Sequence, residues 1–202
     1  MIQRLFAIVL LLCCAAVARA EAQTEPAKDS PKEALLAQDA AAKSGNVDAD
    51  FAFYQTDDEQ QRKLARAIAE GDVAIAKLES AVEKKFGKEF AAQAVRAAGS
   101  EAVSAVRDAR EEVNGDHATI RFKDSESSVP MVRSDGKWKI SLNDWINGVK
   151  PAQVDQLIAS VGKLATEVDH ITELVGQDKF RSGEGVRDRV QRLHDQQFND
   201  RP

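Results

Sequence analysis

Cysteine, aromatic side chains and long apolar runs are all scarce in this chain of 202 residues. The two cysteines, Cys13 and Cys14, both lie within the first 20 residues, so the remainder can form no disulfide, thiol nucleophile or cysteine metal site. Aromatic residues make up 5% of the chain. After residue 20, no run approaches the roughly 20 apolar residues that a membrane-spanning helix needs. The formal net charge of −5 excludes a basic nucleic-acid-binding protein.

The first 20 residues have the three parts of a secretory signal peptide. A short basic start, residues 1–4, precedes an apolar run over residues 5–17, and Ala18-Arg19-Ala20 offers small residues at the two positions that a signal peptidase recognises. The run is short for a membrane anchor. A lipoprotein signal is disfavoured because Leu12, not a small residue, precedes Cys13. We therefore expect residues 1–20 to be cleaved and the product to be secreted or periplasmic, with no membrane association after cleavage.

The mature chain is predicted to be an α+β protein, mostly helical, with a small antiparallel meander of three or four strands. Residues 21–30 are polar and predict a flexible lead-in. Residues 31–149 are predicted to form the α+β domain, and residues 150–202 a helical extension. Because no cysteine remains after residue 20, the hydrophobic core must hold this fold together without crosslinks.

Two long amphipathic helices flank the predicted sheet. The first begins at the capping pattern Thr56-Asp57-Asp58-Glu59 and ends at Gly87. Its apolar stripe repeats every three or four residues and comprises Leu64, Ile68, Gly71, Ile75, Leu78, Val82 and Phe86. Gly71 within that stripe predicts a close helix crossing in preference to a hinge. The second helix runs from Pro151 to Gly176 with a matching stripe. The two stripes could pack on each other, on the sheet, or on a second copy in a coiled-coil homodimer.

Shorter elements complete the pattern. Ser30-Pro31-Lys32-Glu33 predicts the start of a helix that runs to about Lys43, and residues 47–54 predict a second short helix that includes Tyr54. Alternation over residues 118–123 and 137–142 predicts two strands. Turn sequences at Asn114-Gly115-Asp116 and Ser134-Asp135-Gly136 predict hairpins to neighbouring strands. The inward positions are then Ala118, Ile120, Phe122, Trp138, Ile140 and Leu142, none of which titrates.

The order of these motifs resembles the nuclear-transport-factor-2-like superfamily, especially its small secreted bacterial members. The resemblance rests on residues 45–54, the helix end Lys85-Phe86-Gly87, the turn-strand at residues 114–118 and the "DGKWK" turn-strand at residues 135–139. It covers about residues 32–145. It implies helices that precede a curved sheet and form a cone with it, used as a scaffold for binding small molecules or proteins. Some superfamily members are isomerases or dehydratases that place carboxylate, histidine or tyrosine side chains inside the cone, and no such set can be matched here.

No catalytic or metal-binding pattern emerges from the sequence. Phosphate-binding loops, nucleophile elbows, dinucleotide fingerprints and paired metal-binding histidines are all missing. Glu167 and His170 form a single Glu-x-x-His unit, whereas di-metal bundles use two. His117, His170 and His194 are each predicted to be exposed. We therefore expect no catalytic residue, no cofactor and no metal.

Three aromatic residues are candidates for lining a pocket: Tyr54, Trp138 and Trp145. Helix–sheet packing is the simpler explanation for Tyr54 and Trp138. Trp145 follows the last strand, so it is the better candidate for a pocket rim.

The leading hypothesis is an exported, non-catalytic module that binds an unknown protein or a small hydrophobic ligand, but no nucleic acid. One alternative is a cone-type isomerase- or dehydratase-like enzyme, which would require an inward polar residue. The other is a structural helical-hairpin protein, in which the helices of residues 57–86 and 151–175 pair along most of their length.

Overall fold

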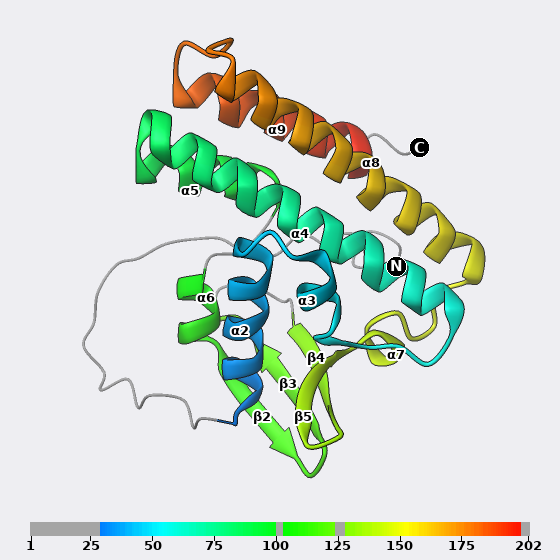
Figure 1. The fold of residues 1–202 in the computed structure, drawn as a ribbon. Helices are drawn as coiled ribbons and strands as arrows, with labels where there is room; N and C mark the ends of the chain where they lie inside the picture. The colour runs from blue at the N-terminus through cyan, green and yellow to red at the C-terminus, as the bar shows by residue number, and fades with distance from the viewer. Residues whose placement is uncertain (1–28, 100–102, 124–127, 199–202) are drawn as a thin grey trace.

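The computed structural model describes residues 29–99, 103–123 and 128–198, which fold into helices and one five-stranded sheet (Figure 1). The predicted α+β class is therefore confirmed. The predicted leader, residues 1–20, and nearly all of the lead-in, residues 21–30, lie outside the described residues. Among those that are described, no helix is both long and apolar enough to cross a bilayer.

The first two helices begin at the side-chain caps that their sequences provide. Helix α2 spans Pro31–Lys43, and Glu33 N donates a hydrogen bond to Ser30 Oγ at 3.2 Å, as the capping pattern predicted. Helix α3 spans Val47–Phe51, and Ala49 N donates to Asn46 Oδ1 at 3.0 Å. The prediction that this helix reaches Tyr54 is wrong, because the chain leaves the helix after Phe51 and enters the sheet.

The sheet is larger and more mixed than the sequence predicted. Strand β1, Tyr54–Gln55, pairs in parallel with the last strand, β5 (Lys137–Ser141), so that the strand order is β1-β5-β4-β3-β2. The prediction of a purely antiparallel sheet of three or four strands is therefore wrong. A strand of two residues has no room for a readable alternation of apolar and polar side chains. Its pairing comes instead from tertiary contacts such as the hydrogen bond from Ile140 N to Phe53 O at 2.8 Å.

The other four strands form the antiparallel meander that the sequence predicted. They are β2 (Arg110–Asn114), β3 (His117–Arg121), β4 (Ser128–Ser134) and β5. Gly115 and Gly136 adopt positive φ angles of 61° and 75° at two of the turns, a conformation that glycine reaches without strain. All six positions predicted to point inward are buried, together with Met131 of β4.

The two long helices lie side by side and run in the same direction (Figure 1). Helix α4 spans Glu59–Phe86 and helix α8 spans Pro151–Gly176. Near their first turns, Gln60 Nε2 donates to Pro151 O at 2.9 Å, and near their last turns Lys85 Nζ donates to Val175 O at 2.8 Å. The two predicted stripes therefore pack on each other along most of their length. The parallel direction is not that of a helical hairpin, whose helices run antiparallel.

The remaining helices close the core from the sides. They are α5 (Lys88–Ala97), α6 (Val103–Asp108), α7 (Leu142–Trp145) and α9 (Gly183–Phe198). Helix α9 packs on α5 and α8, whereas α2 lies against α3, α4 and the inner face of the sheet. The helices that follow residue 150 share one continuous apolar core with the sheet.

Candidate functional site

Four polar side chains meet inside the protein, between α2, α3, β1 and α4. We call Gln38, Asp50, Tyr54 and Asp72 the acid cluster. Gln38 Nε2 lies 2.9 Å from Asp50 Oδ1, 2.9 Å from Asp72 Oδ2 and 3.2 Å from the Tyr54 hydroxyl. The Tyr54 hydroxyl donates to Asp72 Oδ2 at 3.1 Å. One side-chain amide thus links two carboxyl groups and a phenol.

Each element brings its residue to the cluster for a local reason. In α2, Leu35, Gln38 and Ala42 repeat at helical spacing and all are buried, so Gln38 occupies a core position. Tyr54 pairs with Ile140 across the sheet, and paired residues point to the same face, which here is the buried one. Asp72 follows Gly71 on α4, on the side of that helix that faces α2 and α3.

Burial is deepest at Asp50. Its side chain is 0% exposed, compared with 5% for Gln38 and 6% for Tyr54, whereas Asp72 is half-buried. Asp50 Oδ2 has no hydrogen-bond partner among the described residues. An unpaired buried oxygen costs about 1–3 kcal/mol, and a full charge at that atom costs more. The site therefore strongly disfavours the ionised form of Asp50.

The pKa values follow from this environment. Burial, and next the nearby Asp72 carboxylate, raise the pKa of Asp50 to about 8, although the hydrogen bond from Gln38 lowers it. Burial also raises the pKa of Asp72 to about 6, against the hydrogen bonds from Tyr54 and Gln38. Burial and the two carboxyl groups raise the pKa of Tyr54 well above its ordinary value. Near neutral pH, the pair of aspartates holds one proton more than two ordinary aspartates would.

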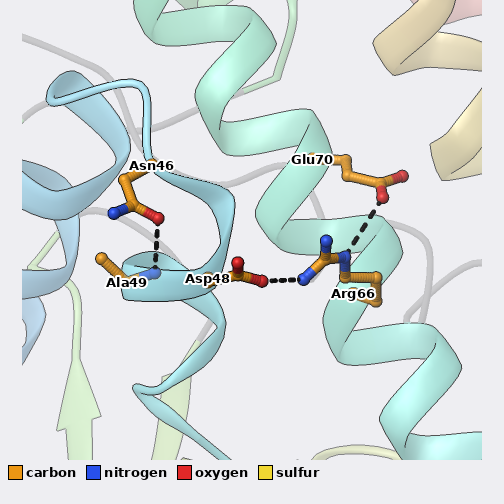
Figure 2. Close-up of polar contacts among 5 residues, drawn as sticks. All are labelled: Asn46, Asp48, Ala49, Arg66 and Glu70. Carbon is orange, nitrogen blue, oxygen red and sulfur yellow. Dashed lines mark hydrogen bonds and ion pairs between the residues drawn. The ribbon is translucent and has the colours of Figure 1, made fainter.

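The exposed side of α3 carries a second, different carboxylate (Figure 2). Asp48 of α3 points toward Arg66 of α4 and forms an ion pair with it, and Arg66 Nε lies 3.3 Å from Glu70 Oε1. The Asp48 side chain is 83% exposed. Residues two apart on a helix point in nearly opposite directions, which explains why Asp48 faces solvent while Asp50 faces the core. Substitutions of the exposed Asp48 can therefore serve as controls for substitutions of the buried Asp50.

The three predicted pocket residues all join the core. Tyr54 and Trp138 are each 6% exposed, and the Arg133 guanidinium lies 5.8 Å from the centre of the Trp138 ring. Trp145 of α7 is half-buried, and its Nε1 is buried without a hydrogen-bond partner among the described residues. Only Tyr54 belongs to the acid cluster. A pocket lined by these three aromatic residues stays a prediction.

The histidines lie apart from the cluster. The side chains of His117 and His170 are 70% and 58% exposed, as predicted. The prediction for His194 is wrong: its side chain is only 17% exposed, its ring centre lies 5.2 Å from that of Phe198, and burial lowers its pKa. In the described part of the chain, no three histidine, cysteine, aspartate or glutamate side chains are arranged to hold a metal ion.

Three residues of the acid cluster, Gln38, Asp50 and Asp72, were not predicted from the sequence. Gln38 was detectable, because it stands at a stripe position between Leu35 and Ala42. Asp72 was not predicted because the sequence pattern indicated only one buried stripe on α4. In the structure this helix also buries residues outside that stripe, since Ala65 and Ala69 are both 0% exposed. Asp50 carried no sequence signal, because α3 is too short to show a period.

The acid cluster has the groups that acid–base chemistry needs, but little access. A carboxyl group with a pKa near neutrality beside a phenol is a common acid–base arrangement. Here Gln38, Asp50 and Tyr54 are buried and bonded to one another, and only Asp72 reaches partway to the surface. A reactant could contact Asp50 only after the surrounding helices had opened.

Comparison of the chain with family models, curated proteins and solved structures found no match.

Proposed function

We propose that the chain is an exported, non-catalytic module that binds a protein or a small hydrophobic ligand, and that it acts in the periplasm or outside the cell. The observation that carries the proposal is that the buried ionisable groups bond to one another instead of facing an open site. Export is supported by the leader pattern of residues 1–20. Expression of the full chain in a bacterium tests export: the extracytoplasmic product should begin at Glu21, and retention in the cytoplasm would contradict it.

Tyr54 is the only tyrosine in the chain, so it reports on access to the cluster. If the cluster is a closed structural element, a nitrating reagent should modify Tyr54 slowly in the native chain and rapidly in denaturant. The modified residue is identified by absorbance and peptide mass. Equal rates in the two states would show that small molecules reach the phenol, which would refute a closed cluster.

The second candidate is an isomerase- or dehydratase-like enzyme, and one specific observation favours it. Asp72 is half-buried, has a raised pKa and accepts the Tyr54 hydroxyl bond, so it could exchange a proton with a bound ligand. Deuterium exchange next to the carbonyl of a small hydrophobic ketone, followed by NMR, tests this candidate. Exchange that the chain accelerates and that Asp72→Asn abolishes would establish it, whereas a rate equal to the buffer rate would remove it.

We also infer a distant relationship to the nuclear-transport-factor-2-like superfamily. Its support is the order of the elements, with helices before the sheet, and the hairpins at the two turns that the resemblance predicted. An experimental structure that shows a cone with an open mouth between helices and sheet would support membership, and a filled interior would argue against it.

A further inference from the structure

The acid cluster joins parts of the chain that are otherwise separate along the sequence. Gln38, Asp50 and Tyr54 belong to residues 31–55, the segment made of α2, α3 and β1, whereas Asp72 belongs to α4. Two hydrogen bonds cross between them, from Gln38 Nε2 and from the Tyr54 hydroxyl, and both end on Asp72 Oδ2. The other polar links between this segment and α4 lie at the surface, at Asp48–Arg66 and Lys43–Glu79.

Around the two carboxyl groups, the surroundings are acidic or neutral. Helix α2 contributes Gln38 and the acidic Asp39, β1 contributes Tyr54, and β5 presents the apolar Ile140 opposite Tyr54. Lys43 of α2 pairs with Asp39 and Glu79 instead. Within the described ranges, neither Asp50 nor Asp72 has a cationic partner at ion-pair distance.

This arrangement tolerates one negative charge better than two. Gln38 Nε2 has two hydrogens for three acceptors, so it cannot fully satisfy two carboxylates and the phenol at once. The unpartnered Asp50 Oδ2 has no donor to stabilise a charge. Two ionised carboxylates in contact with one amide would therefore repel each other, and the hydrogen bonds from Gln38 and Tyr54 offset only part of that repulsion.

We infer that the acid cluster is a pH-sensitive latch: while it retains a proton, it holds residues 31–55 on α4, and at mildly alkaline pH it loses that proton and releases them. The latch uses the chain's own residues and needs no ligand. The proton lost at mildly alkaline pH leaves Asp50, and the new charge repels the ionised Asp72 of α4. The opening is therefore expected between α4 and the segment that carries α2 and α3, and not at the α4–α8 contact.

The direction of the effect follows from proton counts. In the folded chain the pKa of Asp50 is about 8 and that of Asp72 about 6, both above the ordinary aspartate value of 3.8 that applies to the open chain. Between about pH 4 and pH 8, the closed state therefore binds more protons than the open state, so stability falls as the pH rises through this range. From about pH 6 to pH 8 the closed state retains one extra proton. The equilibrium constant for opening therefore rises roughly tenfold per pH unit, or about 100-fold in total.

The test combines amide hydrogen exchange with matched variants. In the purified chain, exchange of the α2 and α3 amides, corrected for the intrinsic effect of pH, should accelerate about 100-fold between about pH 6 and pH 8, and that of the α8 amides should not. Asp50→Asn imitates the protonated carboxyl group and should remove most of this acceleration. Asp48→Asn, on the exposed side of the same helix, should retain it in full.

Each outcome decides the inference. A flat profile in the unmodified chain overturns it, as does an acceleration that is equal in α2, α3 and α8, because the cluster would then act on the whole fold. An Asp50→Asn profile as steep as that of the unmodified chain also overturns it. If Asp50→Asn does not fold, Asp72→Asn serves as the second variant. It removes the carboxylate that helps to raise the pKa of Asp50, so the acceleration between about pH 6 and pH 8 should shrink. A lower slope in either variant, with Asp48→Asn unchanged, supports the latch.

Discussion

Three glycines in helices offer a test of the packing. Replacement by alanine should stabilise the fold at two of them, Gly71 and Gly162, and destabilise it at the third, Gly183. Gly71 lies in the middle of α4, where a Cβ atom would lie 3.6 Å from Val161 Cγ1, an ordinary contact distance. Gly162 in α8 would meet nothing within 4 Å. Gly183 begins α9, and a Cβ atom there would lie 2.3 Å from Phe90 Cγ and 2.4 Å from Phe90 Cβ.

The magnitudes follow from these distances. In a helix interior, alanine is more favourable than glycine by about 1 kcal/mol, so Gly162→Ala should stabilise the fold by about that amount. Gly71→Ala should stabilise the fold by a similar amount, because its new methyl group fits beside Val161. Gly183→Ala should lower the free energy of unfolding by about 1–3 kcal/mol, because the base of the Phe90 side chain must move by about 1 Å to reach an ordinary contact distance. The predicted close crossing at Gly71 is therefore looser than the sequence suggested.

Thermal and urea unfolding of the three variants would measure these effects. For a chain of this size, 1 kcal/mol corresponds to about 2–4 °C in Tm. We expect Gly71→Ala and Gly162→Ala to raise the Tm and Gly183→Ala to lower it. A loss of stability in Gly71→Ala with a gain in Gly162→Ala would show that α4 and α8 approach more closely than described. A gain in Gly183→Ala would refute the docking of α9 on Phe90.

Three further predictions concern the core, the surface and the oligomeric state. Leu78→Ala should cost about 2–5 kcal/mol in urea unfolding, because Leu78 is 0% exposed in α4, and a smaller loss would mean that the helices collapse around the cavity. Arg66→Ala should change the urea midpoint little and not at all at high salt, because the Arg66–Asp48 pair lies at the surface, and a large effect at high salt would contradict this. Sedimentation should find a monomer, because the α4 and α8 stripes bury each other within one chain. A dimer that survives dilution would contradict this expectation and favour the alternative prediction of a homodimer.

The sequence predicted the elements whose signals are local. Helix α8 begins at Pro151 and ends at Gly176 as expected, because proline, glycine and a long apolar period all act within the helix itself. Strand β1 was missed because its two residues form a strand only through pairing with β5, more than 80 residues later. The acid cluster was missed for the same kind of reason: a carboxyl group such as Asp50 is recognised as buried only once α2 and α4 are in place around it.

The parallel pairing of α4 and α8 has a consequence for the order of events during synthesis. The contact between Lys85 and Val175 spans 90 residues, so α4 emerges from the ribosome long before its partner exists. In that interval the apolar stripe of α4 is exposed to other chains. Forming the α4–α8 contact is also slow, because it closes a long loop of chain. A chain truncated after Val149 should therefore aggregate instead of folding, because it lacks the α8 stripe that covers α4.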